Sequence, residues 1–215
     1  MAHIVFDCDG TLISSFHNIV HGISVIVSEY LGKEVSHAEV RKHFTPDVEL
    51  MYKRFGIDLT DELMEKFNKR WGEVTSCTDL KYGLFDGIEE LLKDLKSQGH
   101  NLYVWTARDR FSTTNILKRL NVLHFFDDMR CCDDTPPKPR PHGLNEMVGA
   151  YDTNEVLMIG DSFTDIEGAK YFGCEVVAVF YCENARKEEV LRYDPDYTAA
   201  DASELYEIIQ SKFKG

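Results

Sequence analysis

The sequence of 215 residues contains no apolar run long enough to span a membrane, and it is poor in positive charge. A membrane-spanning helix needs about 20 consecutive apolar residues. The 24 lysines and arginines are outnumbered by 37 aspartates and glutamates, which gives a net charge of −13. This imbalance argues against nucleic acid or an anionic membrane surface as the main partner. It does not exclude a small anionic substrate, because a few local cations can dominate a pocket.

Cysteine is also scarce, and none of the six cysteines belongs to a CxxC pair. Their spacing fits neither a zinc site nor a disulfide framework, so we expect free thiols in a reducing compartment. We interpret the adjacent Cys131 and Cys132 as small core residues near a strand end, and a redox role is the less favoured alternative. A carboxylate pair follows the apolar HIVF almost at once, which argues against a secretory signal. We therefore expect a cytoplasmic protein.

The sequence does contain strand-length apolar runs that alternate with helix-period segments. The runs are HIVF, NLYVW, VLMIG and VVAVFY. Among the helical segments, FDGIEELLKDLKSQGH is the clearest. We expect Asp86 to cap this helix, Glu89 to complete a capping box, and Gly99 to end it. The alternation predicts an α/β fold with a parallel sheet.

One region lacks the alternation and shows only helical patterns. We predict an all-helical domain at residues 15–82, inserted into a core formed by residues 1–14 and 83–215. Within the insertion, Thr45 is expected to cap a helix that has Pro46 at its first position. The histidines are scattered along the chain and suggest surface or packing residues rather than a metal site.

Polar residues stand where the apolar runs end. Asp7 and Asp9 follow HIVF, Thr106 follows NLYVW, and Asp161 follows VLMIG. Lys138 lies in the proline-rich TPPKPRP. In open α/β sheets the carboxyl ends of the strands carry the functional residues. Two carboxylates so close together repel each other and raise each other's pKa, so a cation, a division of roles or both must hold them together.

Each of these residues also has a structural interpretation. Asp-Gly is a common turn, Thr106 can simply end a strand, and Lys138 alone suggests surface charge. Asp161 alone can cap the following helix. Arg108 either contacts substrate or forms a surface ion pair, and we favour the ion pair.

Four motifs together resemble those of the haloacid dehalogenase-like superfamily. In order along the chain they are IVFDCDGTL, VWTAR, KPRP and IGDSFTD. The residues within these motifs are most similar to those of the phosphoglycolate phosphatase-like branch with a helical cap. The resemblance implies a Rossmann-like parallel-sheet core, a helical cap at the insertion, and a Mg²⁺-dependent phosphatase acting on a small phosphomonoester.

The resemblance also implies a metal site. It assigns the side chains of Asp7 and Asp161 and the backbone carbonyl of Asp9 to Mg²⁺, and it gives Asp165 an indirect role through a water or by holding Lys138. An all-oxygen carboxylate cluster suits this hard cation independently of the family.

The implied roles in the reaction are as follows. Asp7 is the nucleophile and Asp9 the general acid and base. Charge on the transferring oxygens is stabilised by Lys138, the Thr106 hydroxyl and the Ala107 N–H, while Gly10 allows a sharp turn beside the phosphate.

Other functions stay open at this point. A phosphomutase of the same branch would use the same carboxylates, and a phosphonate hydrolase, a dehalogenase and a non-catalytic binding protein are weaker alternatives. The sequence identifies neither the substrate nor the oligomeric state. We expect substrate choice to depend on the helical insertion, and within it on Arg41, Lys42 and His43.

Overall fold

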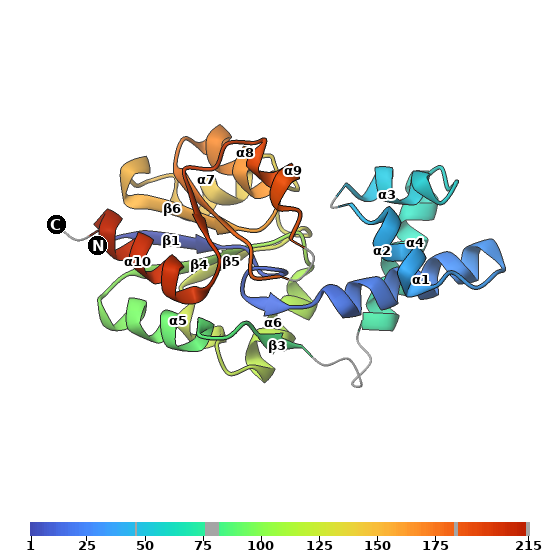
Figure 1. Ribbon diagram of the computed structural model, residues 1–215, viewed down its shortest axis with the longest axis horizontal. Helices are drawn as coiled ribbons and strands as arrows, with labels where there is room; N and C mark the ends of the chain where they lie inside the picture. The colour runs from blue at the N-terminus through green and yellow to red at the C-terminus, as the bar shows by residue number, and fades with distance from the viewer. Residues whose placement is uncertain (46, 76–81, 183–184, 214–215) are drawn as a thin grey trace. The chain divides into compact units, whose positions relative to one another are not determined.

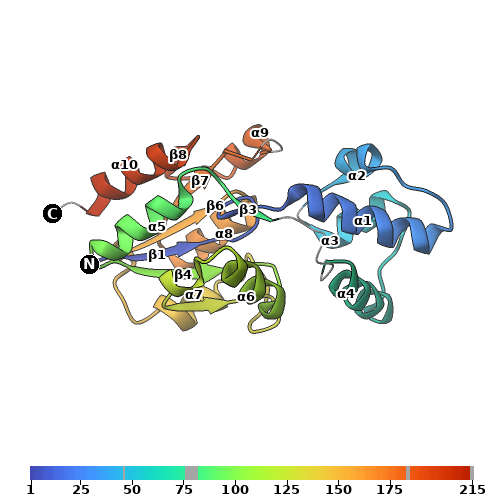
Figure 2. The ribbon, with the colours of Figure 1, turned by 90° about the horizontal axis from the view of Figure 1, so that it is seen from below.

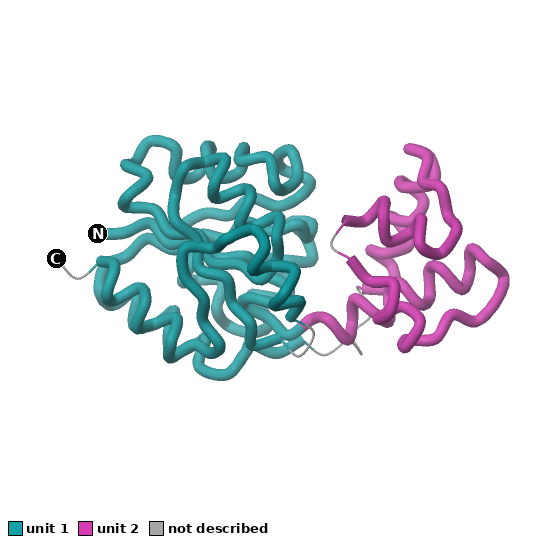
Figure 3. Tube along the Cα trace, turned by 45° about the horizontal axis from the view of Figure 1, so that its top comes forward, with its two compact units in different colours: residues 1–14, 82–215 teal, residues 15–81 magenta. Residues whose placement is uncertain are grey.

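The computed structural model describes residues 1–45, 47–75, 82–182 and 185–213. The chain folds as two compact units (Figure 3). The first unit combines residues 1–14 with 82–215, and the second comprises residues 15–81.

Tyr82 belongs to the first unit, one residue away from the boundary expected from the sequence. The centre of its ring lies 5.3 Å from the Arg108 guanidinium carbon, which is in the same unit. This cation–π contact ties the start of the returning chain to the core.

The first unit is built on a parallel sheet (Figure 1). Its strand order is β5-β4-β1-β6-β7-β8. The predicted runs HIVF, NLYVW and VLMIG coincide with β1, β4 and β6, and VVAVFY overlaps β7, so the predicted α/β class is confirmed. The strands are β1 (His3–Phe6), β4 (Asn101–Trp105), β5 (Asp128–Arg130), β6 (Val156–Gly160), β7 (Glu175–Val179) and β8 (Tyr197–Ala199).

Helices cover both faces of this sheet. The helix α5 (Ile88–Ser97) packs with α10 (Ala202–Phe213) on one face, and α7 (His142–Val148) packs with α8 (Phe163–Phe172) on the other (Figure 2). Side chains of β1 alternate between the two resulting apolar cores, as expected for a strand buried on both sides. The remaining helical elements are α6 (Arg110–Arg119), α9 (Lys187–Leu191), η1 (Leu123–Phe125) and η2 (Thr153–Glu155).

The start of α5 differs from the prediction. The helix begins at Ile88, and its N-cap is Gly87, which has φ 79° and provides no side-chain cap. The left-handed backbone at Gly87 turns the chain directly into the helix, so Asp86 is not the cap. Gly99, with φ 82°, follows the end of the helix as predicted.

The described residues of the second unit form helices joined by loops, with no strand among them. Its helices are α1 (Phe16–Leu31), α2 (His37–His43), α3 (Val48–Arg54) and α4 (Asp61–Thr75), around their own apolar core. The cap of α3 is Asp47, whose carboxylate accepts the Leu50 N–H at 2.9 Å, so Thr45 is not the cap. Pro46 lies outside the described residues. Among the described helices of both units, none has the length and apolar character that crossing a membrane requires.

Three histidines of the second unit gather, contrary to the expected scatter. The His37 ring lies 5.7 Å from that of His17 and 5.6 Å from that of His21, with both pairs nearly perpendicular. His17 and His21 are one turn apart on α1, and the packing of α2 against α1 brings His37 to them.

A short antiparallel ribbon marks where the chain leaves and re-enters the first unit. It consists of β2 (Ile13–Ser14) and β3 (Gly83–Leu84), with Ile13 opposite Leu84 and Ser14 opposite Gly83.

Candidate active site

Asp7 and Asp9 lie just beyond the carboxyl end of β1, where the chain turns sharply. The Asp7 N–H donates to the Ile159 carbonyl at 2.8 Å, which extends the β1–β6 pairing by one residue. Gly10 follows with φ 86°, and a Cβ there would lie 2.1 Å from Asp161 Oδ2. Any side chain would therefore collide with Asp161, so the loop requires glycine.

Lys138 joins two buried carboxylates. Its Nζ lies 2.7 Å from Asp7 Oδ1 and 2.5 Å from Asp165 Oδ1. The ammonium also lies 4.9 Å from the centre of the Trp105 ring. Only 4% of the Lys138 side chain is exposed, which excludes its interpretation as surface charge. Leaving any member of such a buried set without its partner would be strongly unfavourable.

Asp165 holds Lys138 and is itself held by the start of α8. Its Oδ2 accepts the Ser162 N–H at 3.1 Å and the Ser162 hydroxyl at 2.7 Å. Ser162 is the N-cap of α8 and completes a capping box with Asp165, so Asp161 is not the cap. With both oxygens engaged, Asp165 is placed to orient Lys138.

Asp7 and Asp161 resist ionisation. Burial raises the pKa of Asp7 to about 7; Lys138 opposes this rise and Asp165 adds to it. Burial and the charges of Asp7 and Asp165 raise the pKa of Asp161 well above its usual range. Burial alone would lower the pKa of Lys138, but Asp165 and Asp7 outweigh it and hold the pKa above its usual value. Lys138 is thus a stable cation, and ionisation of all three carboxyl groups near it would leave excess negative charge.

This excess charge fits a divalent cation. Asp7, Asp161 and Asp165 each offer an oxygen, and these oxygens lie within 4.8 Å of one another. Three carboxylates against Lys138 leave a negative balance, and oxygen ligands are what Mg²⁺ prefers. Because Asp165 is engaged with Lys138 and Ser162, Asp7 and Asp161 are the side chains best placed to hold such a cation.

The residues after β4 complete this edge of the sheet. The Thr106 N–H donates to the Arg130 carbonyl at 3.0 Å, and the buried Thr106 hydroxyl accepts the Arg108 N–H at 3.1 Å. Ala107 lies exposed between them. The turn is thus held from both sides of Ala107.

Arg108 corrects the prediction from the sequence. It is an ion-pair residue, but its side chain is only 4% exposed, so the pair is not a surface one. Its Nε and Nη2 donate to Asp9 Oδ2 and Oδ1 at 2.9 and 2.7 Å. Burial would lower the pKa of Arg108, but the charge and hydrogen bonds of Asp9 raise it above its usual value. Sequence reasoning missed this partnership, and the available signal was an arginine two residues beyond a polar strand end.

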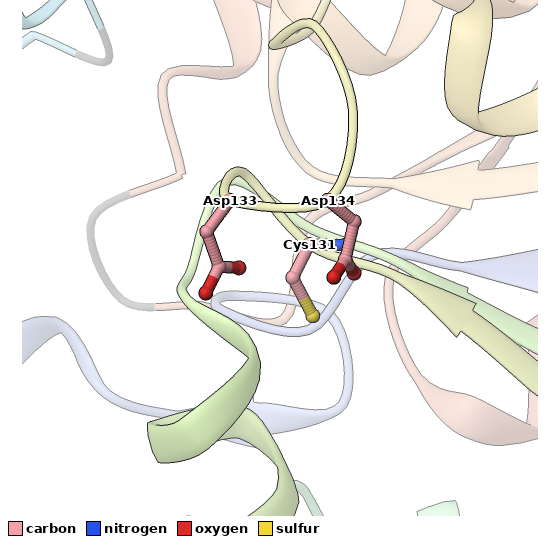
Figure 4. A group of neighbouring side chains, drawn as sticks. All are labelled: Cys131, Asp133 and Asp134. Atoms are coloured by element: carbon pink, nitrogen blue, oxygen red, sulfur yellow. The ribbon is translucent and has the colours of Figure 1, made fainter.

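A second group of possible metal ligands follows β5 and comprises Cys131, Asp133 and Asp134 (Figure 4). Asp134 pairs with Arg110 at 2.6 Å and accepts the Cys131 N–H at 2.8 Å, while Asp133 accepts the Arg110 N–H at 2.9 Å. Burial raises the pKa of the Cys131 thiol to about 12, and the thiolate is the form that binds metals. The group is a hydrogen-bonded loop. Cys131 is buried as predicted, whereas Cys132 is exposed.

Comparison with known proteins identifies the class. A family model described as haloacid dehalogenase-like hydrolase matches residues 4–179. The chain therefore belongs to the haloacid dehalogenase-like hydrolase family, which confirms the resemblance seen in the four motifs and the expectation of a hydrolytic enzyme.

Similar proteins carry phosphatase names. Pyrophosphatase PpaX of Halalkalibacterium halodurans is 27% identical over 97% of both chains. Phosphoglycolate phosphatase of Vibrio parahaemolyticus is 26% identical, over 96% of this chain and 95% of that relative. A crystal structure described as a predicted phosphoglycolate phosphatase from Haemophilus somnus has a TM-score of 0.82 at 24% identity and covers 98% of both chains, which shows the same fold.

Proposed function

We propose that this protein is a Mg²⁺-dependent phosphatase that hydrolyses a small phosphomonoester through an aspartyl-phosphate on Asp7. The observation that carries the proposal is the buried Asp7–Lys138–Asp165 chain of ion pairs. It places the Lys138 ammonium within hydrogen-bond distance of Asp7 Oδ1, just beyond the end of β1. The family membership and the phosphatase names of the relatives support the same reaction.

In the first step, an Asp7 oxygen attacks phosphorus and forms an acyl-phosphate bond while the bond from phosphorus to the leaving oxygen breaks. Lys138 favours the ionised form of Asp7 that this attack needs. In the same step, protonated Asp9 donates its proton to the leaving oxygen, so the product leaves as a neutral alcohol.

In the second step, Asp9 acts as the base. Its carboxylate takes a proton from a water, the water oxygen attacks phosphorus, and the bond to Asp7 breaks. Inorganic phosphate leaves, and both carboxyl groups return to their starting forms. Asp9 suits this double role because the proposed metal contact uses its backbone carbonyl and not its side chain.

Charge on the transferring oxygens would be stabilised by Lys138, the Thr106 hydroxyl and the Ala107 N–H. Gly10 lets the backbone pass close to the phosphate. Mg²⁺ held by Asp7, Asp161 and the Asp9 carbonyl would neutralise phosphate charge during transfer. The helical unit, residues 15–81, would act as a cap that excludes water and selects the leaving group.

A phosphate-release screen with Mg²⁺ tests the proposal. The panel includes 2-phosphoglycolate and pyrophosphate, which the names of the relatives suggest, together with neutral esters such as 2-hydroxyethyl phosphate. We expect release that EDTA abolishes. The Asp7→Asn variant is the control for contaminating phosphatase. Release from no member of the panel would contradict the proposal, and a requirement for a bisphosphate activator would favour a phosphomutase.

A further inference from the structure

The Arg108–Asp9 pair occupies both oxygens of the proposed general acid. Asp9 Oδ1 and Oδ2 each accept an N–H from the guanidinium, in the bidentate arrangement that gives the strongest ion pairs. The Arg108 side chain is almost fully buried, while 22% of the Asp9 side chain remains exposed. In this arrangement both carboxylate oxygens of Asp9 accept hydrogen bonds. To donate a proton to a leaving group it must give up at least one of these bonds.

Arg108 is held beside the site, and Asp9 engages only some of its N–H donors. A guanidinium has five N–H donors, and Asp9 takes two of them. The contact from Nη1 to Ser112 Oγ is long, at 3.5 Å. The Arg108 N–H is fixed on the Thr106 hydroxyl, so the side chain starts next to the proposed phosphate ligand. The guanidinium group is therefore held close to the proposed reaction centre.

We propose that Arg108 recognises a second anionic group on the substrate, and that this contact draws the guanidinium away from Asp9. The released Asp9 carboxylate then takes up a proton from water and donates it to the leaving oxygen as the bond from phosphorus to that oxygen breaks. This inference rests on the proposed phosphatase function. The guanidinium carbon and the Asp9 carboxyl carbon of such a fork are about 4 Å apart. An anion one or two bonds beyond the leaving oxygen would thus lie within reach of Arg108 when Asp9 faces that oxygen.

The substrate class follows from this geometry. It comprises phosphoesters or phosphoanhydrides whose leaving group carries a carboxylate or phosphate near the scissile bond. A planar fork binds either group through two parallel N–H bonds. A substrate with a neutral leaving group offers nothing to replace Asp9, so the pair would persist and slow the first step. Selectivity would then come from the core as well as from the helical unit.

The test compares kcat/KM for three substrates in the wild type, Arg108→Gln and Arg108→Lys. The probes are 2-phosphoglycolate (carboxylate), pyrophosphate (phosphate) and 2-hydroxyethyl phosphate (neutral). We expect Arg108→Gln to lower the ratio of anionic to neutral kcat/KM by roughly 10- to 100-fold, the scale of a charge-assisted hydrogen bond. Arg108→Lys keeps the charge without the fork and should restore only part of the ratio. A fall in the ratio of anionic to neutral kcat/KM for one anionic probe, or for both, shows which anion Arg108 recognises.

A binding measurement separates this inference from the proposed reaction. In an Asp7→Asn background, which cannot turn over, Arg108→Gln should weaken binding of the anionic probes relative to the neutral one by a similar factor. Arg119→Gln removes an exposed arginine from α6, the helix that follows Arg108 in the chain, and is the matched control. Equal losses on all three probes, in both assays, would overturn the inference and leave Arg108 a purely structural residue, even if the enzyme is a phosphatase. Melting curves of each variant check the fold.

Discussion

Lys138 Nζ lies 2.7 Å from Asp7 Oδ1, although 131 residues separate the two in the sequence. The lysine reaches Asp7 from the loop before α7, and Asp165 at the start of α8 fixes its other side. Side chains from three separate segments of the core therefore meet at the ammonium group of Lys138. The position of Asp7 depends on the whole edge of the sheet rather than on its own loop.

The Asp7→Asn variant should lose turnover by roughly 10³-fold or more while keeping its fold. An amide cannot form the acyl-phosphate bond, and the change also removes a charge from the proposed cation site. Phosphate release measures the loss, and circular dichroism checks the fold. Near-normal release would show that Asp7 is not the nucleophile.

The Asp9→Asn variant should be slower by roughly 10²-fold or more, the usual scale of general acid–base catalysis. Its backbone carbonyl remains, so Mg²⁺ binding should change little. Titration with Mg²⁺ by calorimetry, alongside steady-state rates, distinguishes the two effects. A rate close to that of the wild type would rule out the acid–base role.

The Lys138→Met variant should reduce the free energy of unfolding by roughly 3–5 kcal/mol, because it leaves two buried carboxylates without their cation. Urea unfolding at constant pH measures the change. Lys118→Met, at an exposed position on α6, is the matched control and should be nearly neutral. Similar small effects of both substitutions would mean that the ion pairs contribute little.

Stabilisation by Mg²⁺ should grow as the pH rises from 5.5 to 8. A carboxyl group in the unfolded chain ionises near pH 4. In the folded chain without metal, burial raises the pKa of Asp7 to about 7. The metal-free fold therefore loses stability as pH rises towards 7, and a cation recovers it. Thermal melts with Mg²⁺ or EDTA measure the difference. Asp161→Asn should shrink it, and a difference independent of pH would contradict the expectation.

The histidines of the second unit should make the protein less stable in mild acid. Burial, then His21 and His17, lower the pKa of His37. The unfolded chain binds this proton near pH 6.5, whereas the folded chain resists it, so the stabilising contribution is present above pH 6.5 and is lost as pH falls. His37→Gln should lose less stability than the wild type between pH 7.5 and 5.5 in urea unfolding. His124→Gln in η1 is the control, and identical losses in the variant and wild type would refute the prediction.

The sequence predicted the main strands and the polar residues at their ends because both signals are local. Three apolar runs coincide with strands, and parallel strands necessarily bring their carboxyl ends to one edge. Helix starts were predicted less well, since left-handed Gly87 replaced the expected side-chain cap at Asp86. Such a choice depends on how the incoming chain approaches, which residue types do not reveal.

Partnerships across long separations were the hardest to predict. The position of Arg108, two residues beyond a polar strand end, indicates that it lies near the site but not that it pairs with Asp9, 99 residues away. Nothing near His37 indicates that two histidines of α1 face it. The suggested recognition by Arg41, Lys42 and His43 stays a prediction. The Arg41 guanidinium lies 5.2 Å from the centre of the Phe16 ring, which gives this residue a packing role as well.

The ribbon formed by β2 and β3 makes the helical unit a segment that can be replaced by another. Ser14 and Gly83 are directly paired, so the chain departs and returns at neighbouring points. A tight turn could bridge this pair, and the entropy of closing a loop grows only slowly with its length. Inserts of very different size can therefore occupy this position at similar entropic cost, leaving unchanged the sheet and the edge that carries Asp7 and Asp161. The same core could thus acquire new substrates by replacing this one segment.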